Sequence, residues 1–128
     1  MFTRHTPPSI RAPFANYAHG VEVAPGARLL FVSGQLGIGA DGHVPESARD
    51  QARLCFSNIA AVLASAGMGP SDIVRLNAYV SGREHLADYM KARDEFVVLP
   101  APASTLMVVS GFAREIFKVE IEAVAAKA

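Results

Sequence analysis

One stretch of this chain spaces its apolar side chains as an α-helix does, and no other feature constrains the fold as strongly. Ser47 stands where a helix cap belongs, and Gly67 stands where a helix commonly ends. A helix with a single apolar stripe is stable when another element covers that stripe. The chain must therefore provide a second layer for the side chains of the stripe, which are Ala52, Cys55, Phe56, Ile59, Val62, Leu63 and Ala66.

Several short segments have the patterns of β-strands and can form that layer. Residues 74–80 and 117–125 alternate apolar and polar side chains, which is typical of strands with one buried face. Residues 28–33 and 105–109 are short apolar runs, which are typical of buried strands. Residues 17–24 form a further candidate strand that precedes them.

A second helix is predicted over residues 83–97, and Arg93 falls on the same stripe as its apolar side chains. Pro100 cannot continue this helix, because proline lacks the N–H that the next turn requires. Residues 1–13 contain several prolines and are expected to be extended or irregular. The predicted order is β-β-α-β-α-β-β in a single domain spanning residues 1–128. Two such helices need one sheet face to cover them, so the predicted fold class is a two-layer α+β sandwich.

The charge balance limits the partners that the chain is expected to bind. It carries 12 Lys and Arg against 12 Asp and Glu, for a formal net charge of zero. Binding to nucleic acid or to acidic membranes generally requires an excess of basic side chains. No run approaches the ~20 apolar residues of a membrane span. We therefore expect neither nucleic acid nor a membrane as a partner.

The apolar content indicates that part of the surface is hidden by a partner. Hydrophobic residues make up 51% of the chain and charged residues 19%, whereas an average soluble domain has about 25% charged residues. A second copy of the chain is the simplest cover for such a surface. There is one cysteine, Cys55, and the first residues have no signal-peptide pattern, so a reducing cytoplasm is the expected location.

Motifs for metals and cofactors are missing from the sequence. The four histidines are scattered and do not have the spacing of metal ligands. Cys55 lies on the apolar stripe of the first helix, so it is expected to be a small buried side chain and not a nucleophile. Ser33, Gly34 and Gln35 follow an apolar run but lack the glycine spacing of a phosphate loop. We predict no metal and no cofactor.

Two groups of polar residues each have an ordinary and a functional interpretation. Ser33 and Gly34 either form a turn that ends a strand or present a hydroxyl and backbone amides at the rim of a pocket. Glu120 and Glu122 share one face of the last strand, and this face is either solvated or covered by another chain. A partly desolvated carboxylate on a covered face can position a water molecule or act as a general base. The residues alone favour the ordinary interpretation of both groups.

Four stretches together resemble the RidA (YjgF/UK114) family of small trimeric proteins. Residues 31–35, Phe-Val-Ser-Gly-Gln, are similar to the family's FVSGQ, and residues 119–125 are similar to its VEIEAIA. Residues 58–74 and Pro-Ala-Ser-Thr at 102–105 match in the expected order between these two. The resemblance covers about residues 10–126.

The resemblance implies a fold and an activity. The fold is expected to be the chorismate-mutase-like α+β fold, assembled as a homotrimer with clefts between subunits. The expected activity is the hydrolysis of a reactive enamine or imine, a small-molecule substrate, to a ketone and ammonia without a cofactor. A family glutamate positions the water molecule, and a family arginine binds the substrate carboxylate.

The expected site residues follow from the resemblance position by position. Glu120 matches the glutamate that positions water, and Tyr17 and Ser33 match a tyrosine and a serine that line the cleft. The chain departs from the family at two positions, since Ser104 replaces the arginine and Met90 the asparagine, and Leu106 stands where some members carry a cysteine. A serine hydroxyl cannot replace the bidentate, charged contact of an arginine with a carboxylate. An arginine from another element or subunit is the alternative clamp, and the candidates are Arg75, Arg83, Arg93 and Arg114. The expected substrate-binding residues are Gly34, Ser104, Thr105, Met90 and Leu106.

Three functions follow from these observations. The first is an enamine or imine deaminase whose substrate is altered by the loss of the arginine. The second is a trimer that keeps the cleft and binds a small metabolite, or acts in regulation, without catalysis. The third is an RNA-cleaving or translation-inhibiting protein, which the zero net charge disfavours.

Overall fold

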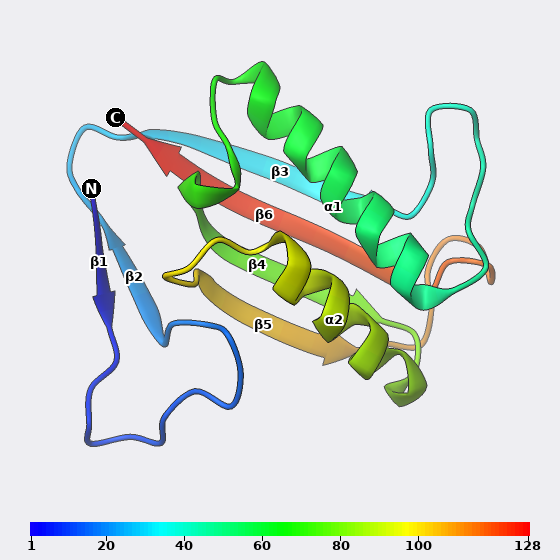
Figure 1. Ribbon diagram of the computed structural model, residues 1–128, viewed down its shortest axis with the longest axis horizontal. Coiled ribbons are helices and arrows are strands. Elements are labelled where there is room, and N and C mark those ends of the chain that lie inside the picture. Colours follow the sequence, from blue (N-terminus) through cyan, green and yellow to red (C-terminus); the bar gives the residue numbers. More distant parts are fainter.

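The computed structural model describes residues 1–128 and packs two helices on one face of a four-stranded sheet (Figure 1). The strands and helices are β1 (Phe2–His5), β2 (Gly20–Val23), β3 (Arg28–Leu36), α1 (Ala48–Ser65), β4 (Ile73–Val80), α2 (Leu86–Phe96), β5 (Ala103–Val108) and β6 (Val119–Lys127). The strand order is β3-β6-β4-β5, in which only β4 and β5 run parallel. The α2 helix connects these two parallel strands, while β1 and β2 form a separate two-stranded sheet. The predicted two-layer α+β class is confirmed.

The first helix has both of the predicted ends. The Ser47 hydroxyl accepts a hydrogen bond from the N–H of Asp50 at 3.0 Å, which satisfies one free donor of the first turn. Gly67 has a φ of 70°, a conformation that disfavours residues with a Cβ. The N–H of Met68 then donates to the carbonyl of Leu63 at 2.9 Å and closes the end of the helix.

The hydrophobic core lies between the helices and the sheet. On α1, Cys55, Ile59 and Leu63 have no exposed surface, as the helical spacing predicts. The β4 and β6 strands bury every second residue toward the helices, including Leu76 and Ile121. The predicted alternation of these strands is therefore confirmed, and their other side chains lie on the opposite face of the sheet.

No element of this chain covers that opposite face, which we call the open face. Figure 1 shows both helices on the same side of the sheet. On the open face, Leu29, Phe31 and Met107 are 56%, 72% and 51% exposed. Glu120 and Glu122 lie on the same face, because their β6 neighbours Val119, Ile121 and Ala123 are in the core.

The N-terminal residues form a strand that the sequence analysis did not predict. Phe2–His5 pairs in antiparallel fashion with Gly20–Val23, at the end of the predicted first strand. The guanidinium of Arg4 donates to the carbonyls of Pro100 and Ala101 at 2.7 and 2.8 Å. These contacts join residues 96 and 97 positions apart in the chain, so no local pattern could reveal them. The β1 strand is therefore an addition to the predicted order.

The β3 strand does not end at Ser33, so the interpretation of Ser33 and Gly34 as a strand-ending turn was wrong. The strand continues to Leu36, and its register against β6 shifts between Val32 and Gln35. Such a shift is a β-bulge, in which one strand holds an extra residue that changes the direction of nearby side chains. Ser33 and Gly34 occupy this bulge, within the sheet.

The remaining differences from the predicted elements are small. The β5 strand begins at Ala103 and not at residue 105, and β6 runs from Val119 to Lys127 and not from 117 to 125. The predicted second helix divides into a 3-10 turn at Arg83–His85 and the α2 helix. No helix of the chain combines the length and the apolar character needed to cross a membrane.

Candidate functional site

The β5 strand divides the predicted site residues between the two faces of the sheet. Ser104 and Thr105 pair with consecutive residues of β4, and consecutive side chains of a strand point to opposite faces. The hydroxyl of Thr105 accepts a hydrogen bond from Arg75 on the open face at 3.0 Å. Ser104 and Leu106 lie instead on the side of the helices. The two halves of the predicted site are therefore separated by the sheet.

The half on the helix side is a cavity of about 280 Å³ between β5, α2 and the loop before β2. It brings together four residues that the sequence analysis assigned to one cleft: Tyr17, Met90, Ser104 and Leu106. The other lining residues are Phe14, Ala15 and Arg93. We call this the helix-side cavity. Arg93 is its one charged lining residue, and it is only 4% exposed.

Backbone pairing beside β5 positions Tyr17. Ala18 forms a parallel bridge with Ala103, and its N–H donates to the carbonyl of Pro102 at 2.8 Å. The Tyr17 hydroxyl accepts a hydrogen bond from the N–H of Phe14 at 3.2 Å. Its own proton is therefore available to a ligand.

The half on the open face contains Gly34 and Glu120. They line a cavity of about 370 Å³, which we call the open-face cavity. The Glu120 carboxylate lies directly against Gly34, and a Cβ at this position would collide with it. The bulge and the glycine together let the acid lie close to the β3 backbone. The other lining residues are Tyr79, Val109, Gly111, Phe112 and Glu122.

The two glutamates of the open face have different partners. Glu122 accepts hydrogen bonds from the hydroxyl of Tyr79 at 3.0 Å and the amide of Asn77 at 3.2 Å. The bond to Glu122 raises the pKa of Tyr79, because it stabilises the protonated phenol. The Glu120 carboxylate accepts no hydrogen bond and forms no ion pair within the chain. It is therefore free to accept a hydrogen bond from water or from a ligand.

Ser33 borders a neighbouring hollow of about 290 Å³ on the same face, together with Phe31, Asn77 and Glu122. Sequence reasoning did not assign Asn77 or Tyr79 to the site. Both lie on the polar side of β4, and this alternation was the one feature of the sequence that could have pointed to them. Their hydrogen bonds to Glu122 depend on the pairing of β4 with β6.

Cys55 is buried in the core, as the sequence analysis predicts. Desolvation raises the pKa of its thiol to about 12, so the thiolate is scarce at neutral pH. This cysteine is a packing residue and not a nucleophile.

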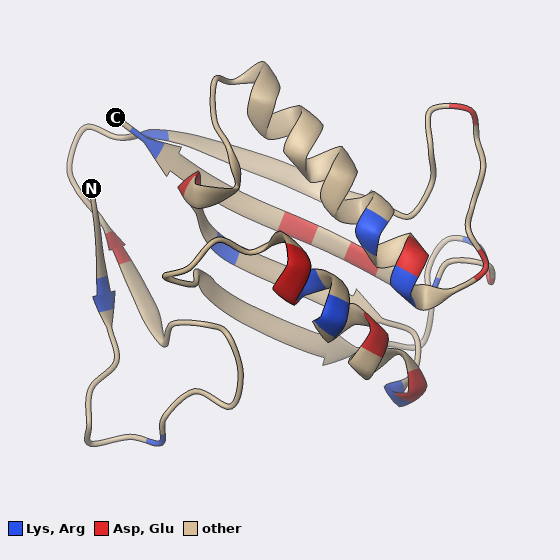
Figure 2. Cartoon of the chain, viewed as in Figure 1, with Lys and Arg blue, Asp and Glu red and all other residues tan.

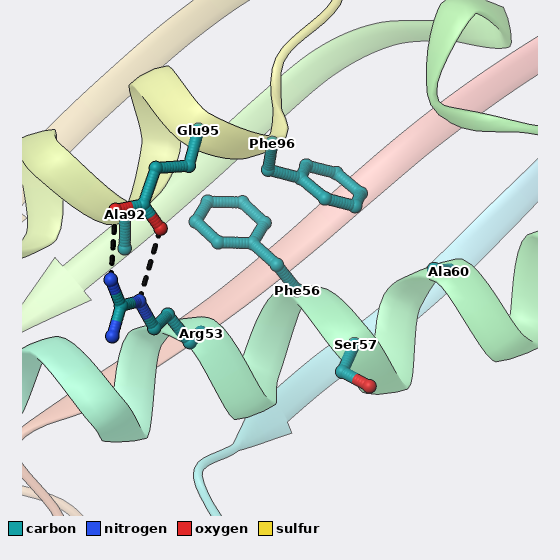
Figure 3. Close-up of a pocket in the computed structure, with 7 residues that line it drawn as sticks. All are labelled: Arg53, Phe56, Ser57, Ala60, Ala92, Glu95 and Phe96. Atoms are coloured by element: carbon teal, nitrogen blue, oxygen red, sulfur yellow. Dashed lines mark hydrogen bonds and ion pairs between the residues drawn. The ribbon is translucent and has the colours of Figure 1, made fainter.

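A further groove lies between the two helices, and no predicted site residue lines it (Figure 3). Phe56 and Phe96 stack there with their ring centroids 4.6 Å apart. Glu95 accepts two hydrogen bonds from Arg53, at 3.0 and 2.9 Å, at one end of the groove. The groove lies at the contact between the two helices, and the ion pair of Arg53 with Glu95 holds its end.

Residues 9–127 match the protein family described as Endoribonuclease L-PSP. The match spans nearly the whole chain. The chain belongs to this family. Its relatives include the RidA, YjgF and RutC proteins, so the resemblance stated from the sequence is confirmed.

Solved structures of RidA-family proteins confirm the fold. The crystal structure of YyfB from Yersinia pestis, a Rid-family protein of unknown function, has a TM-score of 0.87 and 28% identity over 98% of each chain. TdcF of Escherichia coli (strain K12) is 28% identical over 123 residues, which is 91% of this chain and 92% of TdcF. A crystal structure of TdcF with bound serine has a TM-score of 0.68 and 26% identity, and covers 93% of this chain and 91% of that one.

A relative with a named activity is the 2-iminobutanoate/2-iminopropanoate deaminase of Dermatophagoides farinae. It is 27% identical over 114 residues, which is 88% of this chain and 86% of the relative.

Proposed function

We propose that this chain hydrolyses a small imine, or its enamine tautomer, to a carbonyl compound and ammonia. The observation that carries the proposal is the Glu120 carboxylate, which lies in the open-face cavity without any partner from the chain. A general base must be free to accept a proton from water, and Glu120 meets this requirement. Glu122 does not, since Tyr79 and Asn77 already donate to it. The named activity of the Dermatophagoides relative supports the same reaction class.

Water is the nucleophile of this reaction, and one carboxylate can carry its proton transfers. Glu120 accepts a hydrogen bond from a water molecule and orients the oxygen of that water toward the imine carbon. As the C–O bond forms, the π electrons of the C=N bond move to nitrogen, and Glu120 transfers the water's proton to it. Glu120 then takes the hydroxyl proton of the resulting carbinolamine and passes it to the nitrogen, and as the C=O bond forms the C–N bond breaks and ammonia leaves. An enamine first takes a proton at carbon and gives up one from its nitrogen to become the imine, and Glu120 ends each cycle ionised.

We propose that the site is completed between copies of the chain in a homotrimer. Tyr17 and Ser104 lie on the helix side of the sheet, whereas Glu120 and Gly34 lie on the open face. A ligand that touches both sets must therefore sit between two subunits. The exposed apolar side chains Leu29, Phe31 and Met107 support this assembly, because an uncovered apolar face favours association. Both cavities are then parts of one cleft.

The other expected site residues have roles that follow from their positions. Tyr17 and Ser33 each present a hydroxyl that can orient the substrate nitrogen or a carbonyl product. Met90 and Leu106 supply an apolar wall in the helix-side cavity, and Ser104 supplies a neutral hydroxyl. Thr105 is already bound to Arg75, so it supports the open face of β5.

Ammonia release from freshly generated 2-iminobutanoate tests the proposal, with the spontaneous hydrolysis subtracted. Glu120→Gln should lower kcat/KM by about 100- to 10,000-fold, because it removes the proton acceptor. The matched control is Glu122→Gln, which changes the next acid on the same face and should cause a much smaller loss. Unchanged turnover in Glu120→Gln would contradict the mechanism. A wild-type protein that binds the keto acid product without releasing ammonia would support the metabolite-binding alternative.

RNA cleavage, which the description of the matched family names, has less support in this chain. Acidic and basic side chains are interspersed along α2 and the first half of α1, and β5 carries no charge (Figure 2). The formal net charge is zero. A protein that binds RNA generally presents a basic patch or stripe to the phosphates. We therefore assign the cleft to a small molecule.

A further inference from the structure

Arg93 is a buried cation at the edge of the helix-side cavity. It lies on α2, where the sequence places it on the apolar stripe, and it is 4% exposed. Arginine is almost never fully buried without a partner, because its charge must be compensated. The position of Arg93 therefore requires groups that accept its hydrogen bonds.

The chain supplies hydrogen-bond acceptors to only some of the nitrogen atoms of the Arg93 guanidinium. The Nε and Nη2 atoms of Arg93 both donate to one oxygen, Oδ1 of Asp94, at 3.2 and 3.1 Å. Asn16 donates to the same oxygen at 3.1 Å and holds Asp94 in place. The Nη1 atom has no acceptor in the chain, and it is not sealed from solvent. Asp94 thus fixes one edge of the guanidinium and leaves donors of the other edge unused.

The remaining lining of the cavity determines what Nη1 can bind. Tyr17 keeps a hydroxyl proton for donation, because its oxygen accepts the N–H of Phe14. Ser104 offers a second hydroxyl, while Met90 and Leu106 are apolar. Hydrogen-bond donors next to a guanidinium favour a carboxylate, and the apolar side chains favour a short aliphatic group attached to it.

We propose that Arg93 binds the carboxylate of a small aliphatic ligand in the helix-side cavity. Nη1 donates to one carboxylate oxygen, and Tyr17 or Ser104 donates to the carboxylate as well. Contact is end-on and not a two-bond fork along the Nε–Nη2 edge, because Asp94 occupies that edge. Where the ligand is the substrate, the assignment rests on the proposed function and makes that substrate an imino acid.

The negative charge of Asp94 competes with a bound carboxylate for the positive charge of Arg93. Removing that charge should change the affinity for a carboxylate, whereas a purely structural role of Arg93 predicts no such change. Asp94 is 47% exposed and partly neutralises Arg93 before a ligand binds. Asp94→Asn keeps the shape of the side chain and an oxygen acceptor but removes the competing charge. This variant should therefore bind a carboxylate more tightly than the wild type does.

Calorimetric titration with 2-oxobutanoate tests the proposal, since this keto acid does not turn over. Arg93→Gln should weaken binding by about 10- to 100-fold, the usual effect of losing a charge-assisted hydrogen bond. Asp94→Asn should strengthen binding, and 2-butanone, which lacks the carboxylate, should bind equally weakly to all variants. The matched control is Arg11→Gln, because Arg11 stacks on Phe14 at 4.1 Å but does not line the cavity. This control should keep the wild-type affinity.

Several results would overturn the proposal: no saturable binding by the wild type, equal affinity in Arg93→Gln, or weaker binding in Asp94→Asn. Thermal unfolding checks that each variant folds, and if Arg93→Gln does not fold, the Asp94→Asn titration decides.

The binding experiment and the deamination experiment test the two proposals separately. Deamination is tested with Glu120→Gln, and carboxylate binding is tested with Arg93→Gln. Binding that depends on Arg93 without deamination by the wild type would contradict only the deaminase. Deamination by the wild type with binding independent of Arg93 would contradict only the role of Arg93.

Discussion

Gln51 is a polar residue in the core whose side chain connects three separate backbone segments. It has no exposed surface. Its amide donates to the carbonyls of Pro45 at 2.9 Å and Ile116 at 2.8 Å, and its oxygen accepts the N–H of Lys118 at 2.8 Å. These bonds join α1 to the loop before it and to the segment that leads into β6. Gln51 therefore supports the strand that carries Glu120.

We predict that Gln51→Met lowers the free energy of unfolding by about 2–4 kcal/mol, because each buried polar group left unpaired costs about 1–3 kcal/mol. Urea denaturation measures the change. Gln35→Met is the matched control, since Gln35 makes a single exposed bond to the carbonyl of Ser33. The control should change stability by no more than about 0.5 kcal/mol. Equal stability of both variants would show that the buried amide contributes nothing.

Individual site residues were predictable to different degrees. Of the residues matched to the RidA family, Tyr17, Met90, Ser104 and Leu106 line the helix-side cavity, and Gly34 and Glu120 line the open-face cavity. Ser33 borders the neighbouring hollow, and Thr105 is bonded to Arg75 instead. In the sequence, Arg93 was a charge on an apolar stripe and one of four arginines that could replace the family arginine. Its position beside Ser104 depends on how α2 packs on β5, and no local pattern contains that information.

The helices are joined by an ion-pair cluster that follows from the composition of their facing turns. Glu95 of α2 accepts hydrogen bonds from Arg53 and, at 2.8 Å, from Arg49 of α1 (Figure 3 shows the Arg53 pair). These two arginines lower the pKa of Glu95 from 4.5 to about 2, with the bond to Arg53 as the largest cause. A carboxyl group with a lowered pKa stabilises the folded state only while it is ionised.

We predict that Glu95→Gln lowers the Tm at neutral pH by a small amount, because the ion pairs are exposed to solvent. The folded pKa is below the unfolded one, so the contribution is complete above pH 4.5 and is lost as the pH falls toward 2. The Tm difference between wild type and variant should shrink over this pH range. Glu115→Gln removes an exposed acid that has no partner in the chain, and it should show no such dependence. A difference that stays constant with pH would contradict the assignment.

At the level of elements, the errors of sequence reasoning have two physical causes. The β3 strand was predicted from its apolar run, and that run stops at the bulge, where Ser33 and Gly34 interrupt it, so the strand seemed to end at Ser33. The β1 strand has only four residues and depends on pairing with β2 and on the bonds of Arg4. The helix α1 was predictable because its caps and its stripe are all local in the sequence.

For the whole molecule, the sequence predicted the packing of two helices on one sheet face. It did not predict that the site residues are divided between the two faces of that sheet. Two apolar stripes require one sheet face, which the chain provides. The separation of Ser104 from Glu120 follows from the register of β5, β4 and β6, which the sequence does not display. This separation makes self-association a condition for the proposed chemistry.

We predict that the chain is a trimer in solution, with a mass three times the 13.6 kDa of one chain. Phe31→Glu should dissociate it, because Phe31 is 72% exposed on the open face and a buried charge there would lack a partner. Multi-angle light scattering measures the mass, and circular dichroism should show an unchanged fold. Leu99→Glu adds the same charge at a residue that is 67% exposed outside the sheet, so this variant should stay trimeric. Deamination should be lost together with the trimer in Phe31→Glu. A wild-type mass of one chain would refute the assembly, and an active monomer would refute a cleft shared between subunits.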